Sequence, residues 1–237
     1  MNQLEQIKQT FNQIGGKFIS EPGYIAEKLK GIKAFVFDWD GVFNNGTKDQ
    51  NGTSIFSETD SMGTNLLRFS KFLSQGQMPY TAIISGENNS SAFSFTRRER
   101  FNTCYFKVAN KLEALDHFCQ LFDLKPEEIA YFFDDIPDLA VAQRVKIRIF
   151  IQRKANPLLN QFVIKQNYTD YITGSESGNF AVREACELLM GLMGNYDQVV
   201  SARINFSDLY RKYFVLRQEG KTRFYTSENG IISEQNN

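Results

Sequence analysis

The sequence predicts an α/β fold in which a doubly wound, mostly parallel sheet carries helices on both faces. Short apolar runs alternate with helix-like segments from residue 32 to residue 173, which is the pattern of consecutive strand–helix–strand units. Three of the runs end in polar clusters, namely Asp38-Trp39-Asp40, Ser85-Gly86 and Asp134-Asp135. Because ligands bind beyond the carboxyl ends of the strands in such sheets, we expect these clusters to form one site.

Composition narrows the range of functions. A chain of 237 residues is long enough for one sizeable domain with extensions. Its 27 basic residues balance 27 acidic ones, so nothing argues for a nucleic-acid partner. Three scattered cysteines and a single histidine, His117, argue against a zinc site or a disulfide framework. We recognise no leader segment and no membrane-spanning stretch, so we expect a cytoplasmic protein without a membrane partner.

Residues 1–30 are expected to form an N-terminal helical extension. Apolar residues recur at helical spacing before a glycine pair, at Leu4, Ile7, Phe11 and Ile14. A second short helix is predicted from Pro22 to about Lys30, since proline favours the first turn of a helix. We assign these elements to packing and not to chemistry.

The first predicted strand, residues 35–37, ends in two carboxylates, Asp38 and Asp40, and then Gly41. Side chains that alternate along a strand point to opposite faces, so the pair can converge only if the backbone bends, as a glycine permits. Two converging carboxylates suggest a nucleophile and an acid/base, with a hard cation to offset their repulsion. The alternative is a solvated turn, because aspartate and glycine are ordinary turn residues.

The segment Asp38-Trp39-Asp40-Gly41-Val42 resembles the first motif of the haloacid dehalogenase-like phosphohydrolases, which have a Rossmann-like fold. The resemblance implies that Asp38 is the nucleophile and Asp40 the general acid/base. It also requires three further motifs downstream, in order.

The second motif is matched by Ser85-Gly86, at the end of the apolar run 80–84. By resemblance, Ser85 binds a phosphoryl oxygen, and Gly86 lets backbone N–H groups approach the same oxyanion. Taken alone, such a dipeptide is more often a turn. The arginines of the following helix, Arg97, Arg98 and Arg100, are interpreted as a solvated basic face and not as an anion site.

The third motif is matched by Lys111, which opens a predicted helix after the strand 105–108. A lysine at a helix start is unfavourably placed in the helix dipole unless it points toward anions. By the order of the motifs, we assign stabilisation of the phosphoryl group to Lys111 and not to Lys107. Either lysine could instead be an exposed surface residue.

The fourth motif is matched by Asp134, Asp135 and Asp138, which follow the apolar run 131–133. Carboxylates gathered at a strand end repel one another without a cation, and magnesium prefers oxygen ligands. The resemblance makes Asp134 the direct Mg²⁺ ligand, together with a carboxylate oxygen of Asp38 and the backbone carbonyl of Asp40. Asp135 and Asp138 would support the ion, its waters or Lys111. Phe133 occupies a position where the family usually has glycine, a change that could reshape the site.

The loop after Asp40 is expected to form a β-hairpin that projects beyond the catalytic strand. Asn51-Gly52 lies between the strand-like runs 42–47 and 53–57, and this dipeptide is a strong hairpin signal. The intervals between the first three motifs leave no room for a separate cap domain. Further strands are predicted at 147–151 and 168–173, with a short helix from Pro157 between them.

Among family members without a cap, the chain most resembles the 3-deoxy-D-manno-octulosonate 8-phosphate phosphatases, over roughly residues 24–193. Three segments depart from that subfamily: Asn44-Asn45, Val108-Ala109-Asn110 and Ser177-Gly178-Asn179-Phe180. The resemblance therefore implies the superfamily's machinery more strongly than a particular substrate. We expect a catalytic domain at 31–194, and a partly packed extension at 195–237 whose tail, Ser233–Asn237, is disordered.

The leading hypothesis is a magnesium-dependent phosphomonoesterase that hydrolyses a small phosphorylated metabolite, such as a sugar-acid phosphate, through an aspartyl-phosphate. The alternative is a catalytically weak or inactive family member that acts in binding or assembly. We expect a symmetric homo-oligomer, a tetramer by resemblance, because a neighbouring subunit could cover the open site and the apolar hairpin. Otherwise the extension around residues 206–216 would cover the site of a monomer.

Overall fold

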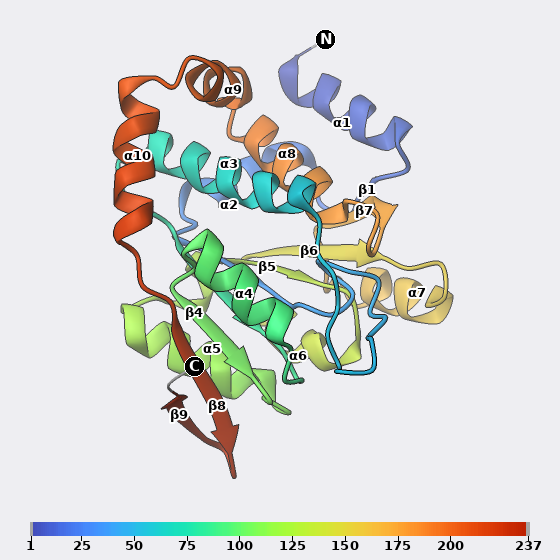
Figure 1. The fold of residues 1–237 in the computed structure, drawn as a ribbon. Coiled ribbons are helices and arrows are strands. Elements are labelled where there is room, and N and C mark those ends of the chain that lie inside the picture. The colour runs from blue at the N-terminus through green and yellow to red at the C-terminus, as the bar shows by residue number, and fades with distance from the viewer. Residues whose placement is uncertain (1, 236–237) are drawn as a thin grey trace.

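The computed structural model describes residues 2–235, which form one mixed sheet flanked by helices (Figure 1). The strand order is β1-β7-β6-β5-β2-β3-β4-β8-β9. The strands are β1 (Lys17–Phe18), β2 (Ala34–Phe37), β3 (Tyr80–Ile84), β4 (Thr103–Phe106), β5 (Ile129–Phe133), β6 (Ile147–Gln152), β7 (Tyr171–Glu176), β8 (Arg223–Glu228) and β9 (Ile231–Gln235). All neighbours from β7 through β8 pair in parallel, and only the outermost strands, β1 and β9, are antiparallel. The predicted mostly parallel α/β sheet is confirmed.

Helices cover both faces of the sheet (Figure 1). They are α1 (Gln3–Gln13), α2 (Pro22–Lys30), α3 (Glu58–Gln75), α4 (Ser90–Glu99), α5 (Lys111–Phe122), α6 (Leu139–Ala142), α7 (Pro157–Lys165), α8 (Ala181–Leu192), α9 (Tyr196–Ile204) and α10 (Asp208–Glu219), with 3₁₀ turns at Pro126–Glu128 and Ile136–Asp138. Strand β2 shows why two layers form, because Phe35 and Phe37 belong to one buried cluster, whereas Ala34 and Val36 belong to the other. Alternating side chains thus bury both faces of the strand. No helix within residues 2–235 has the length and apolarity needed to cross a bilayer.

The N-terminal segment is more than a helical extension. Between α1 and α2, strand β1 pairs with β7, so residues 17 and 18 form one edge of the central sheet. The ring of Phe18 packs edge-on against Tyr171 of β7, with ring centroids 4.9 Å apart. The N-terminal segment is therefore attached to the sheet both through backbone hydrogen bonds and through aromatic packing.

The C-terminal segment also joins the sheet. Tyr210 and Tyr213 of α10 pack on Phe69 of α3, and β8 pairs in parallel with β4. Strands β8 and β9 form a hairpin whose turn residues, Asn229 and Gly230, both have positive φ, as a type I′ turn requires. The expectation that residues 233–237 are disordered is wrong for 233–235, which lie in β9, while residues 236 and 237 are outside the described part of the chain.

The hairpin predicted around Asn51-Gly52 is not formed. Residues 41–57 contain turns but no strand. The side chain of Asp49 accepts hydrogen bonds from the backbone N–H groups of Asn51 and Thr53, both at 2.9 Å, and from the Thr53 hydroxyl at 2.7 Å. A short polar side chain that binds nearby backbone groups in this way stabilises a turn instead of paired strands. We call residues 41–57 the active-site loop, because it follows Asp40 directly.

Candidate active site

The carboxyl ends of β2, β3 and β5 and the start of α5 surround a pocket of about 380 Å³. Every residue singled out from the sequence motifs lines it: Asp38, Asp40, Ser85, Gly86, Lys111, Asp134, Asp135 and Asp138. Neither Lys107 nor the arginines of α4 are among the lining residues. None of the lining residues comes from the described part of the C-terminal extension, so that segment does not cover the pocket as the monomer alternative required.

Lys111 lies at the centre of a buried charge cluster. Its Nζ is 2.5 Å from Oδ1 of Asp38 and 2.5 Å from Oδ1 of Asp138, and all three side chains are buried. Burial alone would lower the pKa of Lys111, but the two carboxylates raise it above its usual value. Burial also raises the pKa of Asp38 to about 7, against the opposing effect of Lys111. The lysine is therefore a fixed cation directly beside the Asp38 carboxylate.

Tyr131 extends this cluster, although the sequence did not single it out. Its hydroxyl donates a hydrogen bond to Oδ1 of Asp138, the atom that also binds Lys111. Asp138 is thus held from two sides and orients the lysine toward Asp38. Phe133, two residues further along β5, is fully buried among core aromatics, so its side chain does not line the pocket.

Asp134 is almost fully buried, and neither of its carboxylate oxygens accepts a hydrogen bond. Burial, and then repulsion from Asp38, raise its pKa to about 9, although Arg153 opposes the shift with an Nη2 atom 2.7 Å from Oδ2. One carboxylate oxygen from each of Asp38, Asp134 and Asp138 lies within 4.8 Å of the others. Three buried carboxylates this close together, of which Asp134 accepts no hydrogen bond from the described residues, form a donor set that suits a hard divalent cation.

Gly41 makes this close approach possible. Its φ is +91°, and a Cβ at this position would lie 2.0 Å from Nη2 of Arg153 and 2.2 Å from Oδ2 of Asp134. Any other residue would collide with this ion pair, so the glycine allows the chain to turn and also leaves space for the pair. Arg153 directly follows β6, and it was not identified from the sequence.

Ser85, which is buried, and Asp135, which is half-buried, also line the pocket. The Ser85 hydroxyl accepts a hydrogen bond from the backbone N–H of Glu87 at 3.2 Å, which shapes the turn after β3. The Asp135 carboxylate accepts a hydrogen bond from the backbone N–H of Ile136 at 2.8 Å and caps a 3₁₀ turn. It does not belong to the carboxylate cluster of Asp38, Asp134 and Asp138.

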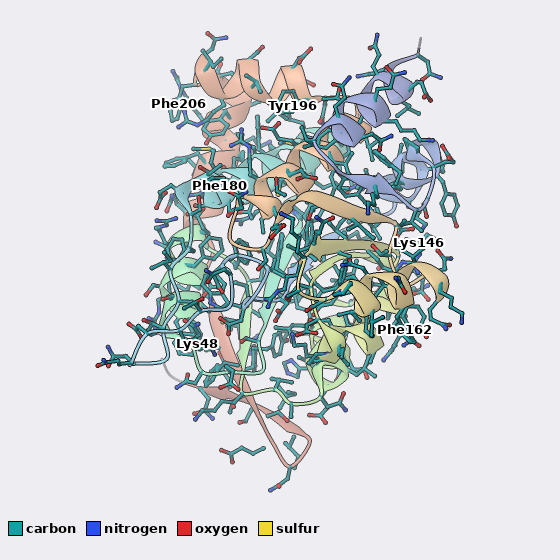
Figure 2. The ribbon with its side chains drawn as sticks, turned by 90° about the vertical axis from the view of Figure 1, so that its right-hand side faces the viewer. Lys48, Lys146, Phe162, Phe180, Tyr196 and Phe206 are labelled. Atoms are coloured by element: carbon teal, nitrogen blue, oxygen red, sulfur yellow. The ribbon has the colours of Figure 1, made fainter. Side chains whose placement is uncertain are left out.

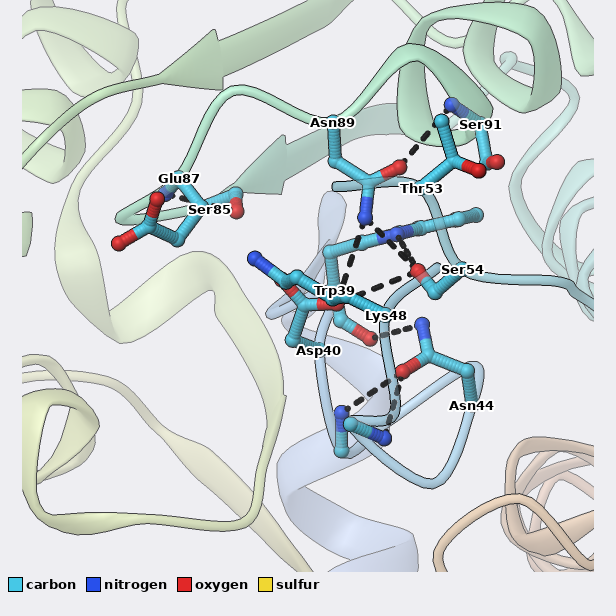
Figure 3. Close-up of polar contacts among 12 residues, drawn as sticks. Trp39, Asp40, Asn44, Lys48, Thr53, Ser54, Ser85, Glu87, Asn89 and Ser91 are labelled. Atoms are coloured by element: carbon cyan, nitrogen blue, oxygen red, sulfur yellow. Dashed lines mark hydrogen bonds and ion pairs between the residues drawn. The ribbon is translucent and has the colours of Figure 1, made fainter. Parts of the chain in front are cut away.

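Asp40 faces the active-site loop (Figure 3). Its Oδ2 is 3.1 Å from Nζ of Lys48, a half-buried side chain on that loop (Figure 2). The loop is tightened by Asn44, whose Oδ1 accepts the backbone N–H of Gly46 at 2.8 Å and whose Nδ2 donates to the Trp39 carbonyl at 3.3 Å. Asn44 therefore closes a compact turn after β2.

Comparisons with known proteins agree with the fold. No protein-family model matches the chain. The 3-deoxy-D-manno-octulosonate 8-phosphate phosphatase of Escherichia coli K12 is 27% identical over 178 residues, which cover 73% of this chain and 87% of that protein. The corresponding Salmonella typhi phosphatase is 27% identical over 179 residues, covering 74% and 88%.

A solved structure of the same kind of phosphatase, from Moraxella catarrhalis in complex with a magnesium ion, a phosphate ion and a KDO molecule, superposes with a TM-score of 0.61. It is 26% identical and covers 75% of this chain and 97% of its own. By sequence and fold, the chain is similar to phosphatases of the haloacid dehalogenase-like type, and among them to the 3-deoxy-D-manno-octulosonate 8-phosphate phosphatases.

Proposed function

We propose that the protein is a magnesium-dependent phosphomonoesterase that hydrolyses a small phosphorylated metabolite through an aspartyl-phosphate on Asp38. The observation that carries the proposal is the buried contact of 2.5 Å between the Asp38 carboxylate and Lys111, in a pocket that also contains Asp40 and Asp134. The proposal therefore has a nucleophile (Asp38), a fixed cation (Lys111), a second carboxylate (Asp40) and a metal-binding carboxylate (Asp134) lining the same pocket.

For the metal, the residues present fit Mg²⁺. We assign its ligands as a carboxylate oxygen of Asp38, the backbone carbonyl of Asp40 and the carboxylate of Asp134, whose two oxygens accept no hydrogen bonds. Bound there, the ion would offset negative charge on the phosphoryl oxygens. Asp138 would keep Lys111 in place, and Asp135 would support the rim of the site. The magnesium ion in the Moraxella catarrhalis structure supports this choice of metal.

In the proposed reaction, an oxygen of Asp38 attacks phosphorus in line with the ester oxygen, and the bond between phosphorus and that oxygen breaks. Asp40 gives its proton to the departing alkoxide, which leaves as an alcohol. Asp40 then takes a proton from water as the water attacks the aspartyl-phosphate, releasing inorganic phosphate and restoring Asp38. Lys111, the Ser85 hydroxyl and the backbone near Gly86 bind the phosphoryl oxygens in both steps.

We propose a sugar-acid phosphate, such as 3-deoxy-D-manno-octulosonate 8-phosphate, as the substrate class. The relatives are named for this substrate, and they support the assignment at 27% identity. The competing function is that of a binding or assembly protein that has kept the fold but lost useful turnover. The segments that differ from the subfamily, Asn44-Asn45 and 177–180, are also consistent with this function.

Phosphate release from a panel of sugar phosphates and sugar-acid phosphates separates these two functions. We expect release that requires Mg²⁺, is abolished by a chelator and is lost in the Asp38→Asn variant. Absence of Mg²⁺-dependent release from every phosphomonoester in the panel would refute the enzyme proposal and favour the binding protein.

We further propose that the protein is cytoplasmic. Its cysteines, Cys104, Cys119 and Cys186, are free and buried, as suits a reducing compartment.

We also propose that the protein works as a homo-oligomer, with a tetramer favoured, in which a neighbouring copy covers the pocket in place of an inserted cap domain. Apolar side chains are exposed at Ile55 of the active-site loop (89% exposed), at Ile136 between two pocket residues (66%), and at Phe180 (48%; Figure 2), whose segment contacts the active-site loop through a hydrogen bond from Ser177 to the Asn44 carbonyl. Light scattering at assay concentration tests the assembly, and a fully active monomer would contradict it.

A further inference from the structure

Two polar residues outside the four motifs hold one oxygen of Asp40 (Figure 3). The Ser54 hydroxyl donates to Oδ1 of Asp40 at 3.2 Å, and Nδ2 of Asn89 donates to the same oxygen at 3.4 Å. Ser54 comes from the active-site loop, and Asn89 comes from the turn between β3 and α4. Two segments that are distant in the sequence thus meet on one carboxylate oxygen.

The orientation of each donor is fixed by its other contacts. Oδ1 of Asn89 accepts the backbone N–H of Ser91 at 3.0 Å, so its Nδ2 must be the end that faces Asp40. The Ser54 oxygen accepts hydrogen bonds from Nδ2 of Asn89 at 2.7 Å and from Nε1 of Trp39 at 3.1 Å. Because both of those contacts use the Ser54 oxygen as acceptor, the hydroxyl proton is available to Asp40.

This hydrogen-bond network is buried and polar, so its side chains have little freedom to move. Asn89 and Trp39 have no exposed surface, and Ser54 is 4% exposed. A buried donor left without an acceptor is costly, so each member resists leaving its place. The other oxygen of Asp40, Oδ2, is also buried and accepts no hydrogen bond from the described residues. It lies 3.1 Å from Nζ of Lys48.

We propose that Ser54 and Asn89 are positioning residues for proton transfer: they hold Oδ1 of Asp40 and so fix the orientation of the carboxylate that gives and takes the proton. The inference rests on the proposed function, in which Asp40 is the acid of the first step and the base of the second. Neither residue is among those that line the pocket, so both would act only through Asp40.

The test is pre-steady-state kinetics of Asn89→Ser with p-nitrophenyl phosphate and Mg²⁺. Serine also caps a helix N-terminus well, but it cannot supply the Nδ2 donor. p-Nitrophenolate leaves without much help from an acid, whereas hydrolysis of the phosphoenzyme still needs Asp40 as base. We therefore expect a burst of about one equivalent of p-nitrophenol per site, followed by a steady-state rate about 10- to 100-fold below that of the wild type.

With an alkyl phosphate the acid is needed first, so the same variant should lose a similar factor in kcat without a burst. Ser54→Ala should behave like Asn89→Ser, and it serves as the second variant if Asn89→Ser fails to fold. Ser54→Thr keeps the hydroxyl and should retain most of the rate. Ser94→Ala is the matched control, because this exposed hydroxyl on α4 bonds only to the Ser90 carbonyl, and its rates should equal those of the wild type.

Two results would overturn the positioning role while leaving the proposed function intact. One is a steady-state rate within twofold of the wild type in both Asn89→Ser and Ser54→Ala. The other is a fall of burst amplitude and steady-state rate in the same proportion, which is the signature of lost folded enzyme. A wild type that hydrolyses no phosphomonoester would instead refute the proposed function, and this role with it.

Discussion

Replacing Asp134 by asparagine tests whether the pocket gives up folding stability in order to bind a metal. Asp134 is 1% exposed, and its pKa is raised from 3.8 to about 9, mainly by burial. A carboxyl whose pKa is higher in the folded state binds its proton more tightly when folded. The stability that it contributes is therefore greatest below pH 3.8 and falls as the pH rises toward about 9.

The size of the effect follows from the shift. Each pH unit between the two pKa values changes the free energy of unfolding by about 1.4 kcal/mol, so the penalty at pH 7 is at most roughly 4 kcal/mol. Asp38 titrates in the same cluster and takes up part of this change. Asparagine does not titrate, so we expect metal-free Asp134→Asn to be more stable than the wild type by about 2–4 kcal/mol at pH 7. At pH 5 the difference should be smaller.

Urea unfolding with a chelator at pH 5 and pH 7 measures this difference, and a second series with Mg²⁺ measures metal binding. Mg²⁺ at about 100 times its Kd should stabilise the wild type by about 2.7 kcal/mol and the variant by much less. Asp116→Asn is the matched control, because this exposed carboxylate pairs with Arg144, away from the pocket, and the variant should keep the full gain. The reasoning fails if Asp134→Asn is the less stable protein at both pH values, or if Mg²⁺ stabilises it as much as the wild type.

Two further substitutions test the nucleophile and the turn that follows it. Asp38→Asn should lower kcat by a factor of about 10³ or more without loss of folding, because an amide is a poor nucleophile. Phosphate release measures the loss of activity, and urea unfolding of the same variant measures its stability. Substantial remaining activity would exclude the covalent route. Gly41→Ala should cost roughly 3 kcal/mol or more of folding free energy, because its Cβ would collide with Arg153 and Asp134 at positive φ. Gly52→Ala, also at positive φ but with nothing within 4 Å of its Cβ, should cost only about 1 kcal/mol in the same unfolding measurement, and equal losses would refute the steric argument.

The placement of the motif residues could be predicted because each lies within a few positions of the end of a strand or the start of a helix. The apolar runs before Asp38, Ser85 and Asp134 are short and continuous, as buried parallel strands require. Once the strands are parallel, their carboxyl ends must meet at one edge of the sheet. The apolar pattern of each strand, together with the rule that parallel strands end at the same edge of a sheet, was therefore enough to predict that these side chains share one pocket.

Arg153 could not be found in this way, because its contact with Asp134 depends on the order of the strands, and Tyr131 was read only as one residue of the apolar run of β5. Strand β5 lies between β2 and β6. Tyr131 contacts Asp138 in the 3₁₀ turn that follows β5, whereas Arg153 reaches Asp134 from the end of the neighbouring strand β6. The position of Arg153 directly after a strand was a usable signal, but nothing in the sequence showed which strand would be its neighbour.

The two Asn-Gly dipeptides show the limit of a local turn signal. At Asn51-Gly52, the side chain of Asp49 binds the backbone on the far side of the turn, and beyond one backbone hydrogen bond from Asp49 to Thr53 the flanking segments form no strands. At Asn229-Gly230, the preceding strand β8 pairs with β4 along the central sheet. A hairpin forms where the sheet supplies a partner for one of its strands, and the dipeptide alone does not provide that partner.

The most direct test of the account is to locate the phosphoryl group during turnover. The Asp40→Asn variant, mixed with Mg²⁺ and p-nitrophenyl phosphate and then quenched in acid, should retain the phosphoenzyme, because its second step lacks a base. Mass spectrometry of the peptides is predicted to find one phosphoryl group on Asp38. A phosphoryl group on another residue, or steady phosphate release by this variant with none on Asp38, would contradict the aspartyl-phosphate mechanism.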